Sequence, residues 1–73
     1  CNAKSQATKL DLLMNNLTEK EHDIVRRARN AKTHNIAKNS DIETYKKATA
    51  FEALVGYLYL KGDYDRLKQI LSY

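Results

Sequence analysis

Residues 49–60 read TAFEALVGYLYL, the most apolar stretch of a strongly polar chain, and its one charged residue is Glu52. At the helical period, the neighbours of Glu52 on its own face include no basic residue. A buried carboxylate without a partner is costly, so Glu52 needs a metal cation, a distant Lys or Arg, or a proton. The small residues Ala48 and Gly56, four positions before and after it, leave open space for such a partner.

The apolar pattern around this stretch predicts a long central helix over about residues 41–61. Its start is indicated by a capping box, with Ser40 or Asp41 as the cap and Glu43 following, and its end by Gly62. The apolar face is broad enough that we expect its centre to be enclosed by other helices. The residues of this face are Ile42, Tyr45, Ala48, Phe51, Val55, Leu58 and Tyr59.

Two amphipathic helices are predicted before the central one. The first covers residues 2–17 and is broken at Asn15 and Asn16; its apolar stripe consists of Ala3, Ala7, Leu10, Met14 and Leu17. Residues 18–21 (TEKE) form a capping box that begins a second helix over about 19–32, with acidic residues in its first turns and basic residues near its end.

After the central helix, Asp63 caps a short last helix, and we expect three of its side chains to pack inward: Leu67, Ile70 and Leu71. The chain has no Pro and no alternating apolar pattern that would indicate a strand. The sequence therefore predicts an all-α fold, a small helical bundle in which residues 1–73 form one domain.

Composition limits the class of protein. With 73 residues, 42% hydrophobic and 30% charged, the chain can build only one small core. The lone Cys1 cannot form an internal disulfide, which suits a reducing cytoplasm. The longest apolar run has about 10 residues, against the roughly 20 of a membrane-spanning helix, so we expect no membrane partner. A formal charge of +4 favours a polyanionic partner.

The basic surface is predicted between positions 26 and 38, which hold five of the 13 Lys and Arg residues. Cations at a helix C-terminus also complement the helix dipole, so a merely solvated face is the competing interpretation. The side-chain amides of Asn30 and Asn39 favour a surface that binds nucleic-acid phosphates over a merely solvated one, because amides bind sugar hydroxyls and phosphate oxygens. The candidate phosphate-binding residues are Arg27, Arg29, Asn30, Lys32, Lys38 and Asn39.

Other chemistries have little support in the sequence. His22 and His34 each lie apart from any Cys or acidic pair at metal-ligand spacing, and we interpret both as surface residues. No Ser or Cys has the His-Asp context of a nucleophile, and no Gly-rich phosphate loop is present.

Several segments together resemble a known family. Residues 49–60 resemble the second acidic signature of ribonuclease III catalytic domains. Residues 27–32 (RARNAK) and 38–45 (KNSDIETY) are similar to Mini-III ribonucleases, the branch of that family without a double-stranded-RNA-binding domain. Residues 2–6 (NAKSQ) are similar to the segment that precedes these motifs, so the resemblance spans nearly the whole chain.

This resemblance implies an all-helical, dimeric enzyme that hydrolyses double-stranded RNA with Mg²⁺, typically in the maturation of ribosomal RNA precursors. Glu52 then corresponds to the catalytic glutamate that binds the metal. Thr49 stands where larger ribonuclease III enzymes have an Asp, which fits the Mini-III branch but removes one acid. The family's first acidic signature would lie upstream of Cys1, so we expect this chain to be the C-terminal part of the domain and to be inactive alone.

The leading hypothesis is therefore a Mini-III-type endoribonuclease with Glu52 as metal ligand, in which the candidate phosphate-binding residues contact RNA. The alternative is a non-catalytic helical module that binds RNA or the ribosome through the same basic helix end, and it would not depend on Mg²⁺. A DNA-binding helix-turn-helix is disfavoured, because the connector after the basic helix is far longer than the usual turn.

Overall fold

The computed structural model describes residues 3–31 and 42–73, and all regular structure within these ranges is helical. This confirms the predicted all-α class. In chain order the elements are α1 (Ala3–Leu13), the 3₁₀ turn η1 (Met14–Asn16), α2 (Glu19–Asn30), α3 (Ile42–Lys61) and α4 (Tyr64–Leu71).

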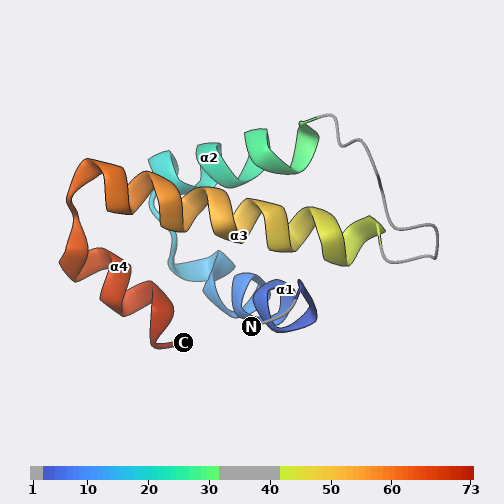
Figure 1. Ribbon diagram of the computed structural model, residues 1–73, viewed down its shortest axis with the longest axis horizontal. Helices are drawn as coiled ribbons and strands as arrows, with labels where there is room; N and C mark the ends of the chain where they lie inside the picture. The colour runs from blue at the N-terminus through green and yellow to red at the C-terminus, as the bar shows by residue number, and fades with distance from the viewer. Residues whose placement is uncertain (1–2, 32–41) are drawn as a thin grey trace.

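The long helix α3 forms the centre of the bundle, as the apolar stretch predicts. Figure 1 shows α2 along one side of α3, with α1 and α4 on the other, and α3 contacts all three. Five of its side chains are buried: Ala48, Ala50, Phe51, Leu54 and Leu58. Because every other helix packs on α3, its exposed surfaces are where a site can be built.

One hydrophobic core joins the four helices. The most deeply buried side chains come from every helix: Leu10 and Leu13 of α1, Val25 of α2, Leu54 and Leu58 of α3, and Ile70 of α4. Each such side chain contributes about 1.5–3 kcal/mol through removal of its apolar surface from water. Within the described residues, no helix combines the length and hydrophobicity that crossing a membrane requires.

Three helix ends follow the local signals in the sequence, whereas the predicted cap of the central helix, Ser40 or Asp41, lies outside the described residues. The Thr18 hydroxyl accepts from the Glu21 backbone N–H, and the Glu21 carboxylate accepts from the Thr18 N–H, which confirms the predicted capping box. Gly62 adopts a φ of 82°, a left-handed conformation that glycine tolerates without steric cost, and it separates α3 from α4. Asp63 caps α4 by accepting from the Arg66 N–H.

Some predicted burial is wrong at the edges of the bundle. Ile42 and Tyr59, assigned to the enclosed face of α3, are 42% and 60% exposed. Leu71 is 46% exposed, although its pattern predicts inward packing. The first helix also ends earlier than expected, at Leu13. The central helix is 20 residues long, so its ends extend beyond the shorter helices that cover its middle.

Candidate metal and RNA-binding site

Glu52 lies on an exposed side of α3, and the prediction that it sits on a buried face is wrong. Its neighbour Phe51 and the nearby Leu54 are buried in the core, whereas the Glu52 side chain points out of it. The core of this bundle is formed by a narrower stripe of α3 than the apolar composition of residues 49–60 suggests. The carboxylate is therefore in contact with solvent.

The partner of Glu52 is a neutral side chain from another helix. The Gln6 Nε2 atom donates a hydrogen bond to Glu52 Oε2 over 3.3 Å. Among residues 3–31 and 42–73, no Lys or Arg forms an ion pair with Glu52. Of the three partners that the sequence left open, a distant Lys or Arg is thus not observed in this part of the chain.

The two small neighbours of Glu52 differ in their surroundings. A Cβ atom placed on Gly56 would meet no atom within 4 Å, so the space on that side is open, as predicted. Ala48 is only 5% exposed and is covered by packed atoms. Access to the carboxylate is therefore open on the Gly56 side of α3.

Glu52 fits a metal site as one ligand. Mg²⁺ commonly uses one or two carboxylates and completes its octahedron with waters and substrate phosphates. A solvent-facing carboxylate without a cationic partner suits this role. Within the described residues, however, no group of three or more His, Cys, Asp or Glu side chains converges as a metal site. These residues supply one ligand and not a complete set.

The predicted RNA-binding residues at the end of α2 lie on the surface, but their charges are paired. Arg27 Nε lies 3.1 Å from Asp23 Oδ2, and Arg29 donates to both carboxylate oxygens of Glu43 at 2.5 and 2.7 Å. Asn30 is exposed. The remaining predicted residues, Lys32, Lys38 and Asn39, lie outside the described residues.

These ion pairs reduce the positive field of the segment without excluding a role in RNA binding. Exposed ion pairs are worth about 0–1 kcal/mol, so a phosphate can replace the carboxylate at little cost. The pairing with Asp23 could have been found in the sequence, because positions three and four apart on a helix are neighbours. The pairing with Glu43 required the packing of α2 on α3.

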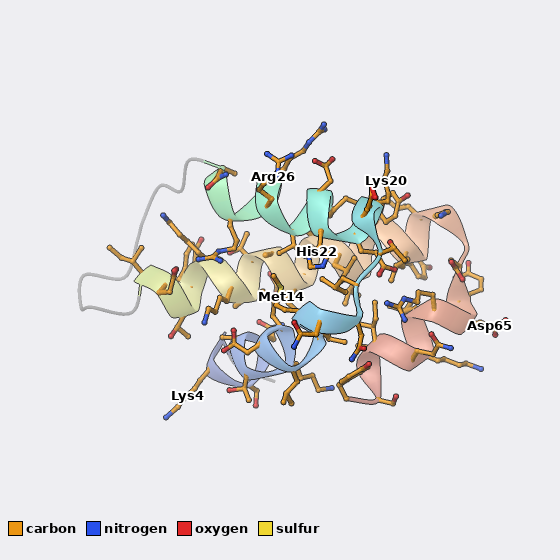
Figure 2. The ribbon with its side chains drawn as sticks, turned by 180° about the vertical axis from the view of Figure 1, so that it is seen from behind. Lys4, Met14, Lys20, His22, Arg26 and Asp65 are labelled. Atoms are coloured by element: carbon orange, nitrogen blue, oxygen red, sulfur yellow. The ribbon has the colours of Figure 1, made fainter. Side chains whose placement is uncertain are left out.

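A hollow of about 600 Å³ lies beside these pairs, between α2 and α3. Figure 2 shows Met14 and His22 over the middle of this side of the molecule, whereas Arg26 extends outward. The positive and negative charges that line the hollow are equal in number. The acidic residues are Glu19, Asp23 and Glu43, and the basic residues are Arg26, Arg29 and Lys46. The hollow therefore presents no net positive charge to a polyanion.

A buried ion pair joins α2 to α4, and sequence reasoning missed it. Arg66 donates from Nε to Glu21 Oε2 at 2.9 Å and from Nη2 to Glu21 Oε1 at 2.8 Å. The same Nη2 reaches the Asn16 carbonyl oxygen at 2.8 Å. The Arg66 hydrogen bond holds the pKa of Glu21 below its ordinary value. The sequence identified Glu21 only as a cap, since its partner is 45 positions away.

Comparison with known proteins agrees with the motifs. A family model described as ribonuclease III domain matches residues 1–63. A Mini-ribonuclease 3 from Brevibacillus brevis is 53% identical over 70 residues, covering 96% of this chain and 52% of that protein. Mini-ribonuclease 3 from Symbiobacterium thermophilum is 54% identical over 70 residues, covering 96% and 54%. Mini-ribonuclease 3 from Staphylococcus aureus is 49% identical over 72 residues, with the same coverage of 96% and 54%.

These matches confirm the resemblance to Mini-III ribonucleases. The chain spans about half the length of the curated relatives it matches.

Proposed function

Because the chain belongs to the ribonuclease III domain family, we propose that it is part of a Mini-III-type endoribonuclease that cleaves double-stranded RNA with Mg²⁺. The observation that carries this proposal is Glu52. It occupies the acidic position of the resemblance, faces solvent on the central helix, and has a neutral amide as its partner. A carboxylate that served only to hold the fold together would be expected to pair with a cation.

The chemistry assigned to this chain is narrow. A Mg²⁺ ion bound by Glu52 would supply Lewis acidity, activating a water and neutralising charge at the scissile phosphate. The chain's own contribution is to fix the position of one carboxylate on α3, a helix anchored by buried Leu54 and Leu58. Within the described residues no group of three or more His, Cys, Asp or Glu side chains converges around Glu52, so the proposed site needs further ligands from outside these residues.

The RNA is expected to be recognised by shape. A-form RNA displays phosphates and 2′-hydroxyls with few readable base edges, which suits Arg, Lys and Asn side chains such as Arg27, Arg29 and Asn30. Lys32, Lys38 and Asn39 are proposed to bind RNA as well. We further propose that the protein acts as a homodimer in the cytoplasm and that its substrates are ribosomal RNA precursors.

The test is Glu52→Gln in the full-length protein. Cleavage of a double-stranded RNA in Mg²⁺ should fall by about 100-fold or more, because the amide cannot replace an anionic metal ligand. RNA binding, measured at one fixed salt concentration, should be retained. The matched control is Glu19→Gln, an exposed carboxylate of α2 outside the proposed site, which should cleave like the wild type.

Two results would contradict the proposal. A Glu52→Gln variant that cleaves like the wild type would remove Glu52 from catalysis. A wild-type protein that binds RNA in a salt-dependent manner, but cleaves none with or without Mg²⁺, would favour the non-catalytic RNA-binding module.

A further inference from the structure

Gln6 is the residue that connects α1 to the proposed metal ligand. The amide Nε2 of Gln6 donates a hydrogen bond to Glu52 Oε2. The other carboxylate oxygen, Glu52 Oε1, accepts no hydrogen bond from the residues that the structure describes. One carboxylate oxygen of Glu52 is thus held by the protein. At 3.3 Å the bond is slightly longer than the usual range, so its contribution to stability is small and its main effect is on orientation.

The position of Gln6 is fixed by the core. The next residue, Ala7, is 7% exposed, and Leu10, one turn further along α1, is 1% exposed and packs in the core cluster with Phe51 and Leu54. Gln6 itself is half-buried. Its amide therefore approaches Glu52 from a rigid helix, which is the arrangement that orients a metal ligand with precision.

The chemical type of Gln6 also suits a cation site. A Lys or Arg at this position would neutralise Glu52 and repel a metal ion, whereas an amide donates a hydrogen bond and leaves the negative charge in place. Hydrogen-bonded partners that orient metal ligands typically change metal affinity or activity by about 10–100-fold when they are removed.

Resting on the proposed function, we propose that Gln6 is a positioning residue that orients the Glu52 carboxylate toward the metal ion. It acts through Glu52 and touches neither the metal nor the RNA. This role depends on one hydrogen bond between α1 and α3. An experiment can therefore distinguish it from the other contacts that pack these two helices together.

The chain offers a matched control for that separation. Asp11 of α1 pairs with Lys47 of α3, with Oδ1 2.9 Å from Nζ, and this pair also connects the two helices without touching Glu52. Asp11→Asn therefore weakens the same helix contact away from the site. Gln6→Ala removes the amide but keeps a good helix former at a half-buried position, so the variant should fold.

The experiment measures Mn²⁺ affinity of the full-length protein by calorimetry and the Mg²⁺ concentration that gives half-maximal cleavage of double-stranded RNA. In Gln6→Ala, Mn²⁺ affinity should fall about tenfold and the required Mg²⁺ should rise by a similar factor. At saturating Mg²⁺ the cleavage rate should approach that of the wild type. Asp11→Asn should match the wild type in both measurements.

A second variant tests the role of charge. Gln6→Lys places a cation beside Glu52, so Mn²⁺ affinity should fall further than in Gln6→Ala. The Gln6 side-chain amide resonance in a ¹⁵N spectrum should also shift in the Glu52→Gln variant, because its acceptor loses its charge. The shift would show that the hydrogen bond forms in solution, and the comparison of Gln6→Ala with Asp11→Asn then separates positioning of Glu52 from helix packing.

The outcomes separate this proposal from the one it rests on. If Glu52→Gln abolishes cleavage while Gln6→Ala binds Mn²⁺ like the wild type, the role of Gln6 is overturned and that of Glu52 stands. If Gln6→Ala and Asp11→Asn lose affinity equally, Gln6 only supports helix packing and the proposal is also overturned. If Glu52→Gln binds Mn²⁺ and cleaves normally, both proposals fail.

Discussion

Glu21 of α2 and Glu52 of α3 are the same side chain in opposite surroundings. Glu21 is 4% exposed, and its carboxylate accepts two hydrogen bonds from Arg66 and one from the Thr18 backbone. Glu52 is exposed and, among the described residues, accepts one hydrogen bond, from the neutral amide of Gln6. The charge of Glu21 is neutralised within the fold, whereas the charge of Glu52 remains available to an external cation.

This difference separates a carboxylate that is paired inside the fold from the one that is proposed to bind a metal ion. The Glu21–Arg66 pair, with the Asn16 carbonyl, joins α2, η1 and α4. A buried pair of this kind need not add net stability over an apolar contact, but breaking it leaves an unpaired charge in the interior. Removal of the Glu52 charge leaves no such group behind.

The largest expected effect is a contrast between the same substitution at the two sites. Glu21→Gln should lower the free energy of unfolding by about 3–5 kcal/mol, because it leaves Arg66 partly buried without its counter-charge. Glu52→Gln should leave this free energy nearly unchanged, since the side chain is exposed. Urea unfolding followed by circular dichroism measures both; equal losses at the two positions would mean that the contrast in burial has no energetic consequence.

The pH dependence of stability should show the same contrast on a smaller scale. Arg66 lowers the pKa of Glu21 in the folded protein, so the pair contributes its full stability above the unfolded pKa of about 4.3. This contribution is lost as the pH falls from there through the lowered folded pKa. Unfolding free energies between pH 7 and pH 3 should therefore decrease more steeply in the wild type than in Glu21→Gln.

A slope in Glu21→Gln equal to that of the wild type would show that other carboxylates cause the acid sensitivity.

The smallest expected effect distinguishes the two roles of Glu21, which are its part in the capping box with Thr18 and its ion pair with Arg66. Thr18→Ala removes the hydroxyl that accepts from the Glu21 N–H but keeps the ion pair with Arg66, so it should cost about 1 kcal/mol. Thr18→Ser keeps the hydroxyl and should stay close to the wild type. Thermal unfolding of the three proteins measures the difference; a loss in Thr18→Ala as large as that in Glu21→Gln would assign the stabilisation to the cap instead of the ion pair.

Much of the fold could be predicted because its signals are local. The capping box at residues 18–21, the left-handed Gly62 and the Asp63 cap each depend on a few neighbouring residues, and all three are confirmed. The limits of the core were harder to predict. Tyr59 and Leu71 follow the apolar pattern, but whether a neighbour covers them depends on the lengths of other helices.

The site was predictable in its residue and not in its surroundings. The sequence singled out Glu52, but its exposure and its Gln6 partner depend on how α1 crosses α3. The pairing of Arg29 with Glu43 was missed for the same reason, because these residues lie 14 positions apart on different helices.

The sequence by itself determined the helical class, the caps of α2 and α4, the central helix and the one carboxylate within its apolar stretch, since helical periodicity and capping act over a few residues. Only the tertiary structure decided which charged side chains are paired with an opposite charge inside the fold and which face solvent. Glu21 and Arg66 lie 45 positions apart in the sequence, and Gln6 and Glu52 lie 46 positions apart. No local sequence pattern encodes contacts at such separations.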